Sequence, residues 1–219
     1  MRKNIELFLK MLDVFALKNP NPKSDLKYVN PYTFTVSVLL SAQSTDKGVN
    51  AATKDLFMSV DNPKSMLDFG IDRLKDKIKT IGLYNSKAKN IIALSEILVS
   101  KFNENIPNNL EDLESLPGIG RKSANVIMNE IYGAKTIAVD THVIRLVNRF
   151  ELFDLSDENI SKINTESPLE IEKLLNQITP DKYKSRVSNW LVLHGRYICK
   201  AKKPDCENCP VSHLCIFKK

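Results

Sequence analysis

Residues 116–122 read Leu116-Pro117-Gly118-Ile119-Gly120-Arg121-Lys122 and separate two segments with helical patterns, 110–115 and 120–132. This arrangement predicts a helix, a tight turn and a second helix. Two glycines in such a turn allow positive φ angles and a close approach of the backbone to a ligand. Free N–H groups at the start of the second helix form an anion site that fits a phosphate. An ordinary turn between helices is the alternative, since Pro-Gly often ends a helix.

The rest of the chain also favours helices, because its apolar residues recur at intervals of three and four. The expected helices cover residues 5–15, 31–43, 46–58, 71–81, 86–102, 110–115, 120–132, 140–149 and 183–198. Residues 33–38 alternate as a strand would, but Asn30 as N-cap and Pro31 at the first helical position favour a helix. We therefore expect an all-α fold. Segment 151–179 has no clear pattern, and its polar part, 156–167, is expected to form a loop or insertion on the outer surface.

The charge balance suits a polyanionic partner. The chain has 219 residues, with 32 Lys and Arg against 26 Asp and Glu, for a net charge of +6. The C-terminal segment 182–219 is the most basic part, although a basic run is also typical of a solvated surface. Charged residues interrupt the apolar ones near the N-terminus, so no secretory segment is predicted. We expect an intracellular, cytoplasmic protein with no membrane partner.

Four cysteines lie close together near the C-terminus with the spacing C-x6-C-x2-C-x5-C: Cys199, Cys206, Cys209 and Cys215. In a reducing compartment, such a cluster favours metal ligands over disulfides. The spacing alone leaves zinc and an iron–sulfur cluster open, and His213 is a possible replacement for one ligand in a zinc site.

Lys122 falls in the first turn of the second helix, where side chains are usually anionic. The positive end of the helix dipole, the neighbouring Arg121 and partial burial would each favour the neutral amine, which is the nucleophilic form. Such an amine can attack C1′ of a deoxyribose, displace the base and form a Schiff base whose collapse breaks the strand. Asp140 is expected to cap helix 140–149. Its carboxylate can also help Lys122 to lose its proton and can stabilise positive charge on the sugar.

Taken together, the glycine turn with Lys122, the run Val139-Asp140-Thr141-His142 and the cysteine spacing resemble the helix-hairpin-helix DNA glycosylases. Within that family they resemble the endonuclease III branch, over nearly the whole chain. The resemblance implies removal of oxidised or damaged pyrimidines from duplex DNA and strand cleavage by β-elimination. Lys122 would be the nucleophile and Schiff-base lysine, and Asp140 the catalytic carboxylate. Related adenine glycosylases lack this lysine and carry an added C-terminal domain.

The same resemblance implies further DNA contacts. The turn after Leu40 is similar to the family's loop that inserts a glutamine into the duplex, and that glutamine would be Gln43 here. Leu83 would be a second side chain that enters the duplex as a wedge. By themselves, Gln43 would be a helix-end amide and Leu83 a core leucine. The other implied site residues are the backbone-contacting Gly118, Gly120 and Arg121 and the lesion-pocket residues Asp46 and His142. Ser44 and Ser123 stand where relatives often have alanine and threonine.

The resemblance also favours one [4Fe-4S] cluster on the four cysteines, with a structural and DNA-binding role to which the loop lysines Lys200, Lys202 and Lys203 contribute. It implies two helical lobes with a DNA cleft between them. Lys122 and Asp140 would face each other from opposite lobes. One lobe is a six-helix helix-hairpin-helix domain, 24–134, and the other combines 1–23 with 135–219 and carries the cluster loop 199–215. We expect a monomer acting on double-stranded DNA that contains damaged pyrimidines or abasic sites. The competing hypothesis is a noncatalytic module that only holds DNA.

Overall fold

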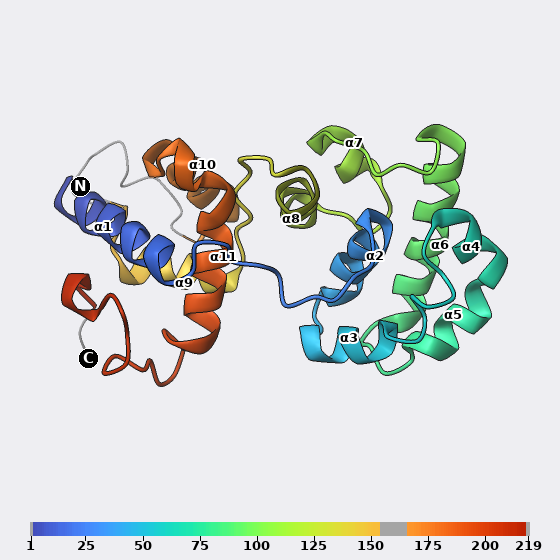
Figure 1. Cartoon of the computed structure of the whole chain (residues 1–219), viewed down its shortest axis with the longest axis horizontal. Coiled ribbons are helices and arrows are strands. Elements are labelled where there is room, and N and C mark those ends of the chain that lie inside the picture. The colour runs from blue at the N-terminus through green and yellow to red at the C-terminus, as the bar shows by residue number, and fades with distance from the viewer. Residues whose placement is uncertain (1, 154–165, 218–219) are drawn as a thin grey trace. The chain divides into compact units, whose positions relative to one another are not determined.

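The computed structural model describes residues 2–153 and 166–217 of the chain (Figure 1). Every regular element in these residues is a helix, so the expected all-α fold is confirmed. None of the described helices is long and apolar enough to cross a membrane. Residues 156–165 of the expected surface loop lie outside the described residues.

The chain divides into two compact units. One unit consists of Met1–Lys23 with Lys135–Lys219, and the other is Ser24–Ala134. The first unit contains α1 (Arg2–Lys18), α9 (Thr141–Arg149), α10 (Pro168–Ile178), α11 (Asp181–Tyr197) and a 3₁₀ turn at Ser212–Leu214. The second contains α2 (Pro31–Ser41), α3 (Asp46–Thr53), α4 (Pro63–Phe69), α5 (Ile71–Ile78), α6 (Tyr84–Lys101), α7 (Leu110–Ser115) and α8 (Arg121–Tyr132).

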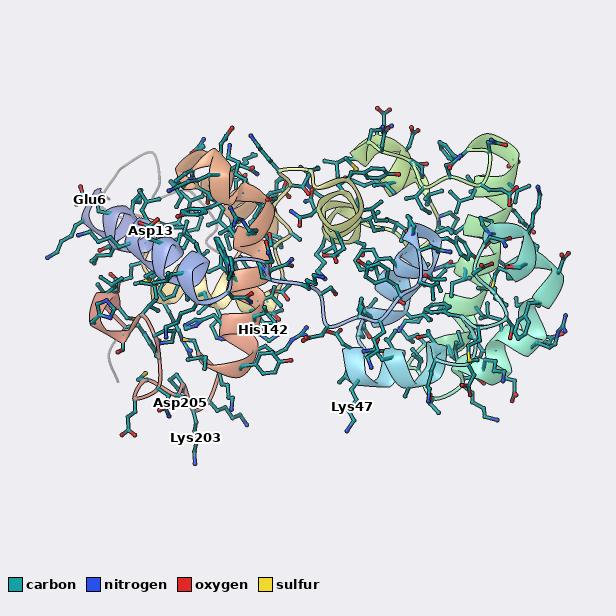
Figure 2. The ribbon with its side chains drawn as sticks, in the orientation of Figure 1. Glu6, Asp13, Lys47, His142, Lys203 and Asp205 are labelled. Atoms are coloured by element: carbon teal, nitrogen blue, oxygen red, sulfur yellow. The ribbon has the colours of Figure 1, made fainter. Side chains whose placement is uncertain are left out.

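In the first unit, the N-terminal helix α1 shares a core with helices more than a hundred residues away in sequence. Phe8 and Leu12 of α1 are fully buried in this core. Two polar contacts tie α1 and the residue after it to α11: Tyr183 Oη donates to Asp13 Oδ1 at 2.6 Å, and Trp190 Nε1 donates to the Asn19 carbonyl at 2.8 Å. Asp13 lies on α1, as Figure 2 shows. The N-terminal segment therefore closes this unit.

In the second unit, α2 is the central helix. Nine consecutive residues, Tyr32 to Leu40, are buried, so this helix has no solvent face. Asn30 caps it as expected, because its side chain accepts a hydrogen bond from the Thr33 N–H at 2.9 Å, and Pro31 occupies the first helical position. The helix expected at 31–43 is thus confirmed over 31–41, and burial on all sides explains why its polar and apolar residues alternate without forming a strand.

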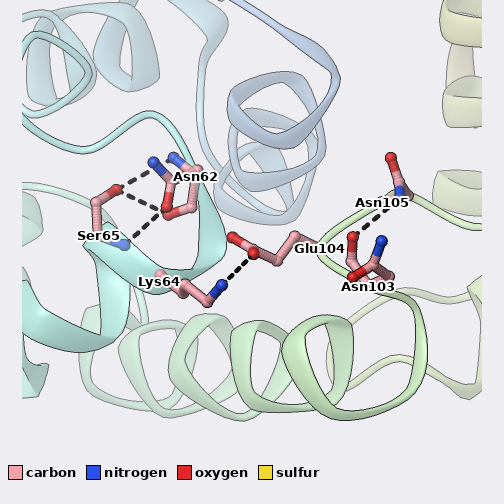
Figure 3. Close-up of polar contacts among 6 residues, drawn as sticks. All are labelled: Asn62, Lys64, Ser65, Asn103, Glu104 and Asn105. Atoms are coloured by element: carbon pink, nitrogen blue, oxygen red, sulfur yellow. Dashed lines mark hydrogen bonds and ion pairs between the residues drawn. The ribbon is translucent and has the colours of Figure 1, made fainter.

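Two helices have no counterpart among those expected from the sequence. The first, α4, accounts for the seventh helix of a unit for which the resemblance implies six. Asn62 caps α4 through a reciprocal capping box with Ser65, and Lys64 forms an ion pair with Glu104 at 2.5 Å (Figure 3). The second, α10, begins at Pro168 after the Ser167 cap. Helix α4 is short and has little apolar periodicity, whereas α10 buries Ile171 and Leu175 in the core of the first unit.

Several helix boundaries also differ from the expected ones. The segment expected to be helical to Met58 ends as α3 at Thr53, and the one expected to reach Ile81 ends as α5 at Ile78. In the other direction, α6 begins at Tyr84, two residues earlier than expected. Leu83 precedes it in the left-handed conformation and thereby sets this start.

Replacing Asn62 with alanine removes the capping box of α4, so we expect a loss of about 1 kcal/mol in the free energy of unfolding. Chemical denaturation followed by circular dichroism measures this loss. The matched control is Asn108→Ala, which changes an exposed asparagine outside the helices and should be nearly neutral. Equal stability of the two variants would contradict the account of α4.

Candidate active site and cluster loop

The turn between α7 and α8 is anchored in the core from both sides of its glycine. Leu116 is 2% exposed and Ile119 is 4% exposed, and the Ile119 N–H donates to the Leu116 carbonyl at 3.0 Å. Gly118 lies between them with φ +82°. The helix, turn and helix expected from the sequence are confirmed, and apolar packing fixes the turn in place.

The two glycines of this turn serve different purposes. A Cβ atom on Gly118 would lie 2.9 Å from Asn90 Nδ2 and 3.0 Å from Leu39 Cδ1, so a side chain there would force these neighbours on α6 and α2 to shift. Gly120 has φ −99°, which any residue adopts, and a Cβ there would meet open space. Gly118 thus adopts the positive φ that glycine permits, whereas Gly120 does not. What Gly120 offers is a bare backbone that another molecule can approach closely.

Helix α8 begins at this bare backbone. Its N-cap is Gly120, which provides no side-chain hydrogen bond to the first N–H groups, and the helix has 12 residues. The positive end of its dipole is thus available to an anion. Lys122 lies in the first turn and is exposed, so the expected partial burial is wrong. Arg121 beside it is half exposed, with Nη1 3.6 Å from Glu114 Oε1.

Asp140 is the N-cap of α9 in the other unit. Its Oδ1 accepts hydrogen bonds from the N–H groups of His142 at 2.8 Å and Val143 at 3.0 Å, so the expected cap is confirmed. The two bonds hold the carboxylate in a fixed orientation. His142, labelled in Figure 2, is half-buried and its Nδ1 lies 3.1 Å from Arg145 Nη2.

The two turns that carry Gln43 and Leu83 adjoin each other. A Cβ on Gly82 would lie 3.8 Å from the Gln43 carbonyl oxygen. Gln43 and Leu83 both have left-handed backbones, with φ +54° and +59°, although neither is glycine. Leu83 is 61% exposed, so it is no core leucine. Asp46 begins α3 a few residues after Gln43 and is half-buried.

The four cysteine thiols line one cavity of about 380 Å³. Burial raises the pKa of the Cys209 and Cys215 thiols, and the neighbouring cysteines add to the effect. A bound cation is therefore needed to hold these groups as thiolates. In the described residues, no three His, Cys, Asp or Glu groups converge on one point as the ligands of a single ion do. A cubane cluster does not require this, because each thiolate binds a different iron. The donor set thus fits a four-iron cluster.

Two residues that sequence reasoning missed support the cysteine loop. Arg149 donates to Cys199 Sγ at 3.0 Å and to the carbonyls of Cys199, Lys200 and Ala201 at 3.1, 2.9 and 2.9 Å. His194 lies with Nε2 3.8 Å from Cys209 Sγ, and burial lowers the pKa of its ring to about 4. In the sequence, Arg149 reads as a basic residue at a helix end and His194 as part of an apolar stripe, so no local signal reveals either role.

Replacing Gly118 with alanine should lower the free energy of unfolding by about 1–3 kcal/mol, because the new Cβ meets Asn90 and Leu39 and the backbone is left-handed. Gly120→Ala is the matched control, since its backbone is extended and its surroundings are open. Thermal or denaturant unfolding of the two variants measures the difference. If both variants lost the same stability, close packing at Gly118 would not be the constraint described.

Comparison with known proteins agrees with this geometry. Residues 36–180, more than half of the chain, match the HhH-GPD superfamily of base excision DNA repair proteins. Residues 199–215 match the iron-sulfur binding domain of endonuclease III.

Relatives that align over nearly their whole length are named endonuclease III. Endonuclease III of Rickettsia conorii is 48% identical over 208 residues, which are 95% of this chain and 94% of that protein. Endonuclease III of Escherichia coli K12 is 42% identical over 210 residues, 96% of this chain and 95% of that protein.

Solved structures extend the comparison to the fold. A trapped endonuclease III–DNA covalent intermediate superimposes with a TM-score of 0.85 at 37% identity, covering 97% of this chain and 96% of that one. A thermostable thymine-DNA glycosylase superimposes with a TM-score of 0.81 at 21% identity, which supports the fold alone. The match over residues 199–215 shows that this chain carries a [4Fe-4S] cluster in its cysteine loop. The chain belongs to the endonuclease III family, the base excision repair glycosylases with AP lyase activity.

Proposed function

We propose that this protein removes damaged pyrimidines from double-stranded DNA and cuts the strand at the resulting abasic site through a Schiff base on Lys122. It would act as a monomer in the cytoplasm. The observation that carries the proposal is the geometry at the start of α8. There, an exposed lysine stands in the first turn of a helix whose N-cap is bare backbone.

The reaction begins with base removal. The neutral amine of Lys122 attacks C1′ of the damaged nucleotide, and the glycosidic bond breaks so that the base leaves with the bonding electrons. The sugar ring then opens to a Schiff base between C1′ and Nζ. Loss of a C2′ proton expels the 3′ phosphate by β-elimination, which cuts the strand. Water finally hydrolyses the Schiff base and frees the lysine.

Asp140 would supply negative charge during base departure. The C1′ centre gains positive charge as the glycosidic bond breaks, and a carboxylate stabilises that charge. Because the backbone N–H groups of His142 and Val143 hold Oδ1, the carboxylate needs no reorganisation when the charge develops. The same carboxylate would help Lys122 to lose its proton.

The remaining DNA contacts follow from what each residue exposes. The bare backbone at Gly120 and the exposed Arg121 suit a phosphate, and Gly118 makes the turn possible. Extruding a nucleotide leaves a gap in the stack. The left-handed, exposed Gln43 and Leu83 would fill that gap from two adjoining turns. We extend the proposal to Asp46 and His142 as contacts of the lesion.

The cluster loop would add affinity and take no part in bond breaking. Cys199, Cys206, Cys209 and Cys215 hold the cluster, whose bound irons supply the charge that keeps these thiols ionised. Three lysines of the loop, Lys200, Lys202 and Lys203, are exposed, and Figure 2 shows Lys203 projecting away from the ribbon. Lysines of this kind attract phosphate without reading sequence.

Borohydride trapping tests the nucleophile. Reduction of the Schiff base on a duplex with one oxidised pyrimidine should yield a covalent protein–DNA adduct. Lys122→Ala should abolish the adduct and slow strand cleavage by roughly 10³-fold or more, because no other group replaces the amine. Lys101→Ala, at an exposed lysine in α6, is the control. No adduct with the unchanged protein would favour a noncatalytic DNA-binding module, and an undiminished adduct in Lys122→Ala would exclude Lys122.

Asp140→Asn separates catalysis from capping. Asparagine caps helices as well as aspartate does, so the melting temperature and DNA affinity should stay close to those of the unchanged protein. Base removal in single turnover should slow by about 10²-fold or more, because the amide has no charge. A normal single-turnover rate, or a rate that falls only as the folded fraction falls, would leave Asp140 with a capping role alone.

A further inference from the structure

Lys87 is a buried lysine for which the proposed chemistry has no use. It lies in the first turn of α6 and is 5% exposed. Its ammonium donates three hydrogen bonds, to the Leu40 carbonyl at 2.8 Å, the Ala42 carbonyl at 2.6 Å and Ser44 Oγ at 3.0 Å. All three acceptors belong to the end of α2 and the turn after it. All three hydrogen bonds that the ammonium donates therefore go to one short segment.

This segment needs such a contact. Leu40 and Ala42 lie at the C-terminus of α2, where carbonyl groups lack partners within the helix and the dipole is negative. The next residue, Gln43, has a left-handed backbone, which costs a non-glycine residue free energy and persists only where the surroundings impose it. Lys87 supplies a positive charge to the helix end and a bond on each side of Gln43.

The same residue is part of the second turn. The Lys87 N–H donates to the carbonyl of Leu83 at 3.0 Å, which is the first helical bond of α6. Leu83 is left-handed as well, and the adjacent Gly82 approaches the Gln43 carbonyl. Lys87 therefore binds the Gln43 turn with its side chain and the Leu83 turn with its backbone.

Burial makes this arrangement costly. Desolvation lowers the pKa of Lys87, and an apolar side chain of similar volume would often serve stability as well or better. An apolar side chain would not bind the carbonyls of Leu40 and Ala42, however. What the lysine adds is a fixed geometry of the turn.

We propose that Lys87 is a positioning residue that holds the Gln43 and Leu83 turns as one rigid block, so that both side chains enter the duplex together when a nucleotide is extruded. The inference rests on the proposed wedge roles of Gln43 and Leu83. It assigns Lys87 no contact with DNA and no part in bond breaking. Its effect should appear only when the base stack must be opened.

The test compares one oxidised pyrimidine in two settings, a fully paired duplex and a duplex in which flanking mismatches have already opened the stack. Lys87→Met keeps a long side chain but removes all three donors. We expect base removal from the paired duplex to slow by at least about 10-fold, with most of that loss recovered on the mismatched duplex. The fluorescence rise of a 2-aminopurine next to the lesion, which reports unstacking, should fall in parallel.

Three further variants keep the inference falsifiable. Lys89→Met removes the same charge from an exposed position of α6 and should match the unchanged protein. Lys87→Arg retains a buried cation with donors and should recover part of the loss. Ser44→Ala removes one acceptor and should give a smaller loss of the same pattern, even if Lys87→Met folds poorly.

The outcomes separate this inference from the function on which it rests. Equal loss on the two duplexes would make Lys87 a general stability residue, and no loss on either would remove its role altogether. If the unchanged protein removes no base from either duplex, the proposed function fails. If it removes the base and Lys87→Met and Ser44→Ala behave identically to it, only the inference about Lys87 fails.

Discussion

Close packing at Gly118 is the constraint on which the site depends. The turn before α8 lies so near α2 and α6 that a Cβ atom on Gly118 would displace Leu39 or Asn90. This contact fixes where α8 begins, and hence where the bare N–H groups and Lys122 stand. A turn held less tightly would leave the proposed nucleophile on a mobile loop, with an entropy cost at each turnover.

The same two helices organise the adjoining turns. Leu39 contacts Gly118, and the carbonyl of the next residue, Leu40, accepts a hydrogen bond from Lys87. Asn90 follows Lys87 by three residues on α6, so one face of that helix contacts both the α8 hairpin and the Gln43 turn. The second unit therefore holds the α8 hairpin, the Gln43 turn and the Leu83 turn against the same pair of helices, of which α2 is buried along most of its length.

In the first unit, the cysteine loop is held in place mainly by side-chain contacts. This loop has a single 3₁₀ turn after α11, so it has little backbone structure of its own to define its shape. Arg149 binds three carbonyls and one sulfur of this loop, and the cluster completes the cross-links between the cysteines. The unit can thus hold exposed lysines on a loop without enclosing them in a larger core.

The sequence predicts the parts of this molecule that depend on neighbours along the chain. The cap at Asn30 and the cap at Asp140 were both expected, since each needs only a side chain and the next few N–H groups. The short helix α4 was not expected, because its seven residues give little periodicity.

Contacts between distant segments could not be predicted in this way. No local pattern indicates that Lys87 is buried against the end of α2, or that Arg149 reaches the cysteine loop. The same limit explains why the partial burial expected for Lys122 is wrong, since the exposure of that side chain depends on how the hairpin packs. The catalytic roles proposed for Lys122 and Asp140 follow from the combination of motifs.

The central claim is that the reacting amine is the one held at the start of α8. Peptide mapping tests it most directly: the protein is reduced with borohydride on a duplex containing one oxidised pyrimidine, digested, and analysed by tandem mass spectrometry. The account predicts a sugar adduct on the peptide that contains Lys122 and on that residue alone. An adduct on another lysine, or on the N-terminal amine, would contradict it.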